Sequence, residues 1–268
     1  MLCRIYLNKI LAAGMFLFYW LLIVQPPAAV PTPELDPSWS SALSYFAAGR
    51  WQLGSEIIFT FGPLGFIYPN YYSGYWLTAT ILIELLVKAA IAWQLLLVTK
   101  RAGKPWGLLF FLLILLFSHP IKDYLFHFSI TLALILIIEA LHHRRRLIIW
   151  VAFLAILSLI KFSFLVMSLA GLVSIGIYAA IDRNWKSLVA LAAVYAVSLL
   201  LVWTLAGQNP FGIYDYLIAG WQIAAGYQKS MFHRSDSAPL IVGLTMLAAS
   251  AIILILYGVN SPQLAAIV

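Results

Sequence analysis

The sequence contains little charge and almost no cysteine. Charged residues make up 9% and apolar residues 64% of its 268 positions, whereas an ordinary soluble domain is about 25% charged and about 45–50% apolar. A soluble globule of this length would leave much of that apolar surface in water, but a lipid bilayer accepts it. The single cysteine, Cys3, excludes an internal disulfide framework and any zinc site built from cysteines.

Other patterns are also missing from the chain. Residues 49–55 have the glycine spacing of a nucleotide-binding P-loop but lack the lysine that precedes its serine. No segment alternates between polar and apolar residues as the strands of a membrane β-barrel do, and no internal repeat is visible. A net charge of +7 would suit a nucleic-acid-binding protein, but the basic residues form short clusters between apolar segments. This pattern predicts membrane lipid, and no nucleic acid, as the partner.

The apolar segments predict an all-α fold, a polytopic transmembrane helical bundle that forms a single domain over residues 1–268. Helices satisfy their backbone hydrogen bonds internally, as lipid requires. The alternative for the first segment is a cleaved signal peptide with small residues at Ala28 and Ala29, and the apolar ending Ala265 to Val268 is typical of a truncated chain. We expect about eight spans, at residues 10–24, 75–98, 106–117, 124–141, 147–160, 164–181, 188–206 and 240–257.

The basic residues favour one orientation of these spans. If the N-terminus is cytoplasmic, ten of the 16 lysine and arginine residues fall on the cytoplasmic side, which is the bias of the positive-inside rule. We therefore predict a multi-pass protein of the bacterial inner (cytoplasmic) membrane, with long outer loops at residues 25–74 and 207–239. The basic residues expected on the outer side are Arg50, Lys122, Lys161, Lys229 and Arg234.

The first outer loop contains a predicted amphipathic helix. Asp36 followed by Pro37 is typical of a helix start, with the aspartate as N-cap. Apolar residues then recur at spacings of three and four, which favours a helix lying on the membrane surface. Its proposed face consists of Trp39, Leu43, Phe46 and Arg50, and residues 59–66 after it form an aromatic, turn-rich stretch.

Residues 147–181 are too long for one span. A helix of this length would extend about 52 Å, against a hydrocarbon thickness of about 30 Å, so we predict a break at Lys161-Phe162-Ser163. The spans at 106–117 and 147–160 are then short, and their polar outer ends lie below the lipid surface. Because such ends require protein or water around them, we expect a cavity open to the outer leaflet, lined by His119, Lys122, Asp123 and Lys161.

Several residues are candidates for chemistry, each with a structural alternative. Asp36 is either a general base or only the N-cap. Lys161 either binds a phosphate or extends its ammonium to the outer interface. His119, Asp123 and His127, spaced four and four, suit a divalent metal ion, although Pro120 favours a satisfied polar cluster instead.

Two further contacts follow from helical spacing and charge. Glu84 and Lys88 are four residues apart within one span, which predicts an ion pair; a proton or ion relay is the alternative. Glu139 is expected to pair with the cluster Arg144 to Arg146.

The order of a first span, a long outer loop with an early aspartate, short spans with polar outer turns, and a lysine after an apolar run resembles the GT-C class of integral-membrane glycosyltransferases. This class includes protein O-mannosyltransferases and aminoarabinose transferases. Residues 157–162 (LSLIKF) look like its apolar run followed by lysine. Asp36 occupies the place of its first-loop acid, and Asp123 that of the acid between the third and fourth spans.

This resemblance implies transfer of a sugar from a polyprenyl-phosphate donor on the outer face of the membrane. The chain departs from the class in having no second acid beside Asp36 and in being short. Residues 35–72 also resemble uncharacterised bacterial polytopic membrane proteins. The alternatives are a transporter or lipid flippase, or a non-catalytic membrane subunit of an envelope assembly complex.

Overall fold

The computed structural model describes residues 2–25, 30, 32, 35–69, 74–101, 103–117 and 122–230. The chain divides into two compact units, Met1–Ile223 and Ala224–Val268. Only residues 224–230 of the second unit are described, and helices α1 to α8 all belong to the first. The expected last span, residues 240–257, lies outside the described residues, and the single domain over 1–268 stays a prediction.

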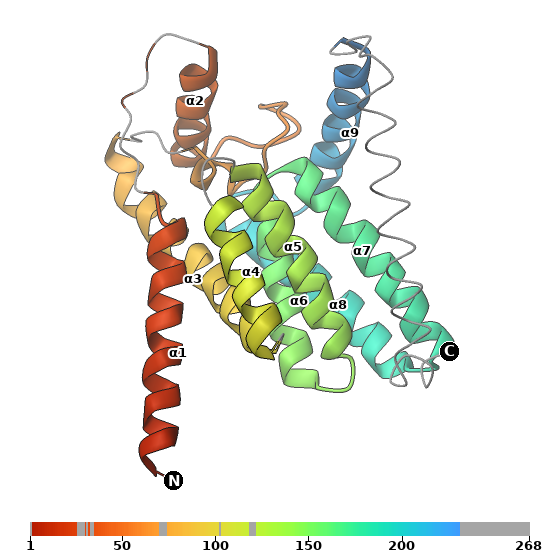
Figure 1. Cartoon of the computed structure of the whole chain (residues 1–268). Helices are drawn as coiled ribbons and strands as arrows, with labels where there is room; N and C mark the ends of the chain where they lie inside the picture. Colours follow the sequence, from red (N-terminus) through yellow and green to blue (C-terminus); the bar gives the residue numbers. More distant parts are fainter. Residues whose placement is uncertain are drawn as a thin grey trace, which may run out of the picture. The chain divides into compact units, whose positions relative to one another are not determined.

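The described part of the chain is helical, with turns, two short 3-10 helices and two isolated β-bridges (Figure 1). Helices α3 to α8 run in alternating directions along the chain. The helices are α1 (Leu2–Ile23), α2 (Leu35–Gly49), η1 (Gly65–Ile67), η2 (Gly74–Trp76), α3 (Leu77–Arg101), α4 (Gly103–Phe117), α5 (Lys122–Glu139), α6 (Arg144–Ser158), α7 (Phe162–Ile181), α8 (Trp185–Leu205) and α9 (Gly212–Ser230).

Helices α1 and α3 to α8 coincide with seven of the expected spans. Three of them, α3, α7 and α8, are long and apolar enough to cross a membrane. The apolar parts of α1 and α5, Lys9–Ile23 and Tyr124–Glu139, are shorter. Helices α4 and α6 have 15 residues each, or about 22 Å at 1.5 Å per residue, so helices as short as those expected are present at both places.

Helix α9 was not predicted. It lies within residues 207–239, where we expected an outer loop without a helix. The buried residues on it are few and include Tyr216 and Ala219, because only a narrow side of the helix packs on the protein. A search for continuous apolar runs therefore passed over it.

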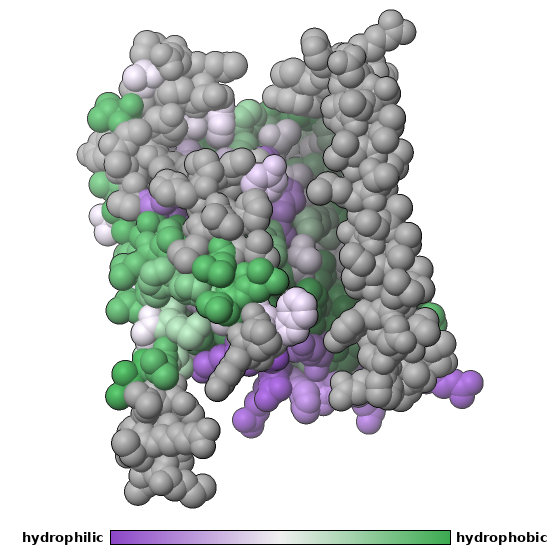
Figure 2. Space-filling model, in the orientation of Figure 1, coloured by the Kyte–Doolittle hydropathy of each residue, from purple (hydrophilic) through white to green (hydrophobic). Residues whose placement is uncertain are grey.

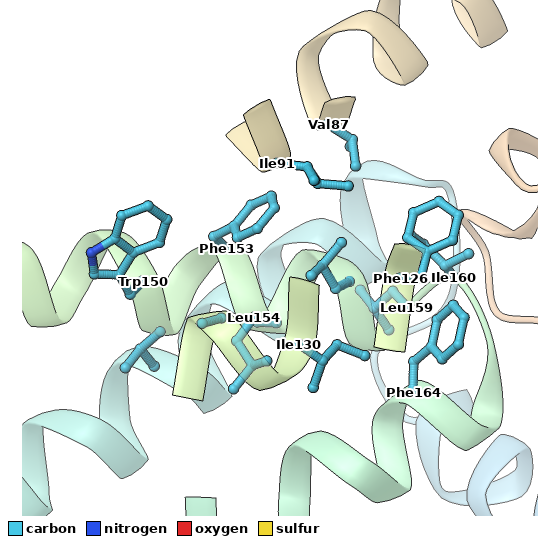
Figure 3. Close-up of a cluster of buried hydrophobic side chains, with 14 of the residues drawn as sticks. Val87, Ile91, Phe126, Ile130, Trp150, Phe153, Leu154, Leu159, Ile160 and Phe164 are labelled. Carbon is cyan, nitrogen blue, oxygen red and sulfur yellow. The ribbon is translucent and has the colours of Figure 1, made fainter. Parts of the chain in front are cut away.

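The core is built around α6, which packs against α5, α7 and α8, while α3 packs against α1, α4 and α5. Figure 3 shows a cluster of buried side chains that come from four helices and from the turn after α6. The labelled members of this cluster are Val87, Ile91, Phe126, Ile130, Trp150, Phe153, Leu154, Leu159, Ile160 and Phe164, all buried.

Large apolar side chains also cover the outside of α7 and α8. Exposed fractions reach 77% for Ile181 and Leu205 and 65% for Val189 and Val197. On another part of the surface, apolar residues gather at mid-height on the left of the visible face (Figure 2). Transfer of one large apolar side chain out of water is worth about 1.5–3 kcal/mol. Such a surface is stable against lipid, which agrees with the length of these helices.

Three basic turns meet at one end of the first unit. Arg101, at the end of α3, forms an ion pair with Glu139 at the end of α5. His142 in the turn between α5 and α6 lies 4.0 Å from Asp182 and 3.5 Å from Asn184, both next to α8. Figure 2 shows hydrophilic residues at this end, which we call the basic end.

The expected pairing of Glu139 with Arg144 to Arg146 is wrong, since its partner is Arg101. Packing of α3 against α5 brings the last turns of both helices together. The ion pair expected within α3 is present: Lys88 contacts Glu84, and the two residues are only 6% and 4% exposed.

Candidate functional site

The break between α6 and α7 covers residues 159–161 and shares Lys161 with the predicted break at residues 161–163. Helix α6 ends at Ser158 and α7 begins at Phe162. Lys161 is the residue before α7, with an extended backbone (φ −147°, ψ 142°) and no capping bond from its side chain. A break inside an apolar stretch frees backbone groups that need other partners.

An aromatic loop, residues 57–68, supplies those partners. Phe162 donates its backbone N–H to the carbonyl of Thr60 (2.7 Å), and the N–H of Gly62 donates to Ile160 (3.1 Å). Leu64 donates to the carbonyl of Leu159 in the same way (3.0 Å). The stretch expected to be aromatic and turn-rich is therefore paired with the helix break about a hundred residues later in the sequence.

Gly62 makes this close approach possible. A Cβ atom at this position would lie 2.3 Å from the carbonyl oxygen of Leu159, well inside any van der Waals contact. At Gly65 a Cβ would lie 2.7 Å from the Cβ of Phe61. Gly62 is thus required by packing of the loop against the break, and Gly65 by close packing within the loop itself.

Aromatic rings surround the ammonium group of Lys161. Its Nζ lies 5.0 Å from the ring centroid of Tyr68, 5.4 Å from that of Phe61 and 5.9 Å from that of Phe164. The residue is half-buried. Each cation–π contact contributes about 0.5–2 kcal/mol, more where water is excluded, so the rings hold a partly desolvated positive charge at the start of α7.

The same rings connect this lysine to α2 and α5. Trp39 of α2 stacks on Phe61 with centroids 5.2 Å apart, and Phe126 of α5 lies 5.5 Å from Phe164. The ring of His127 contacts Phe164 edge-on at 4.9 Å. We call Trp39, Phe59, Phe61, Tyr68, Phe126 and Phe164 the aromatic cluster.

The helices that carry the candidate acids therefore adjoin Lys161. Asp36 precedes Trp39 by three residues on α2, and Asp123 precedes Phe126 by three residues on α5. Lys122 and Asp123 are the first two residues of α5. The side chains of these three candidates and all of His119 lie outside the described part, so the cavity expected around them stays a prediction.

Helix α2 differs in two ways from the expectation. It begins at Leu35, so Asp36 is inside its first turn rather than the N-cap; a carboxylate is favoured there as well. It ends at Gly49, and Arg50 follows with a positive φ of 53°. Leu43 is buried in the protein core, so this side of α2 packs on the aromatic loop and not on the membrane surface.

The described residues alone do not complete the expected metal site. Among the described residues, no group of three or more histidine, cysteine, aspartate or glutamate side chains is arranged to hold a metal ion. His127 is in place on α5, whereas His119 and the side chain of Asp123 are not described. Their joint role in binding a divalent metal ion stays a prediction.

Two glutamines fasten the loops at this end to each other. The side chain of Gln52 donates to the carbonyl of Gly207 (3.1 Å) and accepts the N–H of Asn209 (2.7 Å). Gln208 in turn accepts the N–H of Leu53 (2.9 Å) and donates to Trp51 (2.9 Å). We call these four bonds the glutamine latch. The two loops predicted on the outer side thus lie on one side of the fold.

Tyr216 anchors α9 beside the break. Its ring lies 5.9 Å from that of Phe162 and 5.4 Å from that of Trp203. The hydroxyl is buried and has no hydrogen-bond partner within the described residues. Complete burial raises the pKa of Tyr216 far above its ordinary value, because the phenolate would lose its hydration.

The ring partners of Lys161 and the glutamine latch were not predicted. The one signal for the rings was the pair of glycines within an aromatic run at residues 59–66, which indicates a close backbone approach. For the latch there was no signal, because isolated glutamines in two loops do not reveal their partners. Local patterns cannot specify contacts between such distant segments.

The chain matches no protein-family model, no curated protein and no solved structure. The function must therefore be argued from its own residues. A half-buried ammonium group beside the start of a 20-residue helix is an arrangement that attracts anions, since the helix N-terminus adds partial positive charge.

Proposed function

We propose that the protein is a multi-pass membrane protein of about eight spans that transfers a sugar from a polyprenyl-phosphate donor on the outer face. The observation that supports this best is the position of Lys161, held by aromatic rings at the start of α7. Phosphate is the natural partner of such a cation. An aromatic and apolar surround suits the lipid part of the donor.

The charge distribution supports the orientation in this proposal. The turn residues of the basic end, among them Arg101, Arg144 and Lys186, are exposed and would face the cytoplasm by the positive-inside rule. Helix α6 runs from Arg144 to Ser158 and thus separates the basic end from the break with Lys161. The break, the aromatic loop and the glutamine latch then belong to the outer leaflet of a bacterial inner membrane.

The proposal gives each candidate residue a role. Lys161 binds the donor phosphate, and Lys122, His119 and Asp123 contribute to the same head-group site. Asp36 takes the proton from the acceptor hydroxyl as general base. If the reaction uses a divalent metal ion, Asp123 and His127 are its candidate ligands, since one carboxylate and one imidazole are suitable donors.

The test of the phosphate site is binding and transfer in reconstituted liposomes with a polyprenyl-phosphate sugar. We expect Lys161→Ala to weaken donor binding and Lys161→Arg to preserve part of it, because arginine keeps the charge. The matched control is Lys100→Ala, which removes one exposed lysine at the basic end. Equal donor binding by the wild type, Lys161→Ala and the control contradicts the proposed role.

The test of the general base is Asp36→Asn in the same assay. Asparagine can still accept a hydrogen bond at a helix start but cannot take a proton. We expect a folded, membrane-inserted protein whose transfer rate falls by about 10²–10⁴-fold. Full activity of Asp36→Asn would show that Asp36 has only a structural role and is not the general base.

A second function, transport or lipid flipping, is favoured by one observation. Glu84 and Lys88 form a buried ion pair inside α3, a helix that can cross a membrane. Charges at such positions commonly mark ion or substrate pathways. Transport predicts that Glu84→Gln abolishes uptake or lipid movement in liposomes, whereas sugar transfer predicts an effect on stability alone.

A further inference from the structure

A groove between α6 and α8 opens at the basic end. Its volume is about 870 Å³. One end of it is formed by the turn residues that precede the two helices, and the other by apolar side chains of the helices themselves. Its lining residues include His142, Arg144, Ile148, Lys186, Val189 and Ala193.

The polar end of the groove is positively charged. Arg144 and Lys186 line it, and both are exposed. No acidic residue is among the described residues that line it. Asp182 lies 4.0 Å from His142. Two permanent cations therefore face this end, and one neighbouring carboxylate is directed to a histidine.

The helix ends add to this potential. Helix α6 begins at Arg144 and α8 at Trp185, and the first turn of each contains no acidic residue. Cations in the first turn are unfavourable for a helix, because its N-terminus is already partly positive. A bound anion would offset this repulsion. The positions of Arg144 and Lys186 therefore favour binding of an anion, although they do not favour the stability of the two helices.

The rest of the groove is apolar and faces outward. Val189 is 65% exposed and Ile148 38% exposed, and Ala193 is exposed on the same helix as Val189. Helix α8 is long and apolar enough to cross a membrane. Trp185, 60% exposed at its first turn, has the position of a tryptophan at the membrane interface. A ligand of this groove must combine an anionic head with an apolar tail.

We propose that the groove binds an anionic phospholipid of the leaflet at the basic end. The phosphate lies against Arg144 and Lys186, and an acyl chain follows Ile148, Val189 and Ala193. Basic pockets between membrane helices are known to hold such head groups. The inference does not depend on sugar transfer, because it concerns the opposite end of the helices from Lys161.

The experiment uses the full chain purified in detergent with equal amounts of phosphatidylglycerol and phosphatidylcholine, and native mass spectrometry counts the lipids that stay bound. The wild type is expected to retain phosphatidylglycerol preferentially. The double variant Arg144→Gln/Lys186→Gln is expected to lose about 30-fold of that preference, since each basic residue near an anionic lipid contributes about fivefold.

The control variant is Arg145→Gln/Arg146→Gln, which removes the same charge from exposed residues of the same helix turn that do not line the groove. It is expected to retain phosphatidylglycerol as the wild type does. An equal loss in both double variants means general attraction to basic turns and overturns the site. Equal retention of the two lipids by the wild type overturns it as well.

Two further arms test the lipid tail. Ala193→Trp fills the apolar part of the groove at an exposed position and is expected to reduce lipid retention without changing any charge. Excess inorganic phosphate is expected to leave the lipid bound. Full displacement of the lipid by phosphate would identify a simple anion site. Unchanged lipid retention by Ala193→Trp would exclude an acyl chain in the apolar part of the groove. Either result overturns the proposal.

Discussion

Tyr216 carries a polar group that the fold does not pair. Its hydroxyl is buried against Phe162 and Trp203 without a hydrogen-bond partner within the described residues. An unpaired buried hydroxyl costs about 1–3 kcal/mol. The aromatic ring therefore stabilises the contact between α9 and the start of α7, and the hydroxyl opposes it.

Removing this hydroxyl should change the response to alkaline pH. The folded-state pKa of Tyr216 is raised, so its contribution to stability is complete below the unfolded pKa of about 10 and is lost as pH rises further. We expect Tyr216→Phe to be at least as stable as the wild type near neutral pH and to lose less stability above about pH 10. Thermal unfolding in detergent at both pH values measures this.

The control for that experiment is Tyr214→Phe. Tyr214 lies on the same helix but is 67% exposed, so this variant removes a phenol that the protein does not bury. The alkaline response of Tyr214→Phe should match the wild type. An identical response of Tyr216→Phe would show that burial of Tyr216 has no effect on its ionisation.

Among single residues, the sequence predicted Lys161 as a candidate but not the aromatic rings around its ammonium group. A lysine between two apolar runs is visible in the sequence because charge is rare there. The rings of Phe61 and Tyr68 are about a hundred residues away in the chain, and only folding brings them to the ammonium. Gln52 and Gln208 were missed for the same reason.

Among the elements, the aromatic loop has the largest effect on the candidate site. It closes the break between α6 and α7 through three backbone hydrogen bonds and supplies two of the rings around Lys161. Its own regular structure is limited to the 3-10 helix η1. The position of the lysine therefore depends on a segment that is held by tertiary contacts and not by its own helix.

The glycine at position 62 is the most direct test of this dependence. Gly62→Ala places a Cβ 2.3 Å from the carbonyl oxygen of Leu159, and such overpacking costs about 1–3 kcal/mol. We expect lower thermal stability and faster hydrogen exchange across residues 57–68. Gly14→Ala is the control, since no atom lies within 4 Å of its added Cβ and alanine favours a helix.

Hydropathy predicted the helices better than the loops. Seven expected spans correspond to helices, and the break at residues 161–163 lies at the start of α7, because the lipid thickness limits the length of an apolar helix. Helix α9 was missed because its apolar side is narrow. The pairing of the aromatic loop with the break depends on contacts across the chain, which no local period reveals.

For the whole molecule, the distribution of charge gives a prediction about orientation. The basic end and the end with the glutamine latch lie at opposite ends of α6 and α8. The positive-inside rule assigns the former to the cytoplasm. The expected number of spans, about eight, includes the segment at 240–257, which the described residues do not reach.

Cysteine labelling in intact cells measures this orientation. In a Cys3→Ser background, Ser55→Cys and Phe211→Cys should react with an impermeant thiol reagent, because both positions are exposed at the latch end. Lys100→Cys and Arg145→Cys, exposed at the basic end, should react only after the cells are permeabilised. The reverse pattern, or equal labelling of all four, would contradict the orientation.

The glutamine latch can form only late in synthesis, because its two halves are far apart in the sequence. Gln52 and Gly207 are 155 residues apart, and a ribosome adding about 5–20 residues per second needs roughly 8–30 s to cover that distance. During this interval the aromatic loop can already pair with the break at residues 159–162, but the backbone groups of Trp51 and Leu53 still lack the partners that Gln208 supplies. The segment at residues 51–53 is therefore fixed in place only after residues 207–209 have been synthesised.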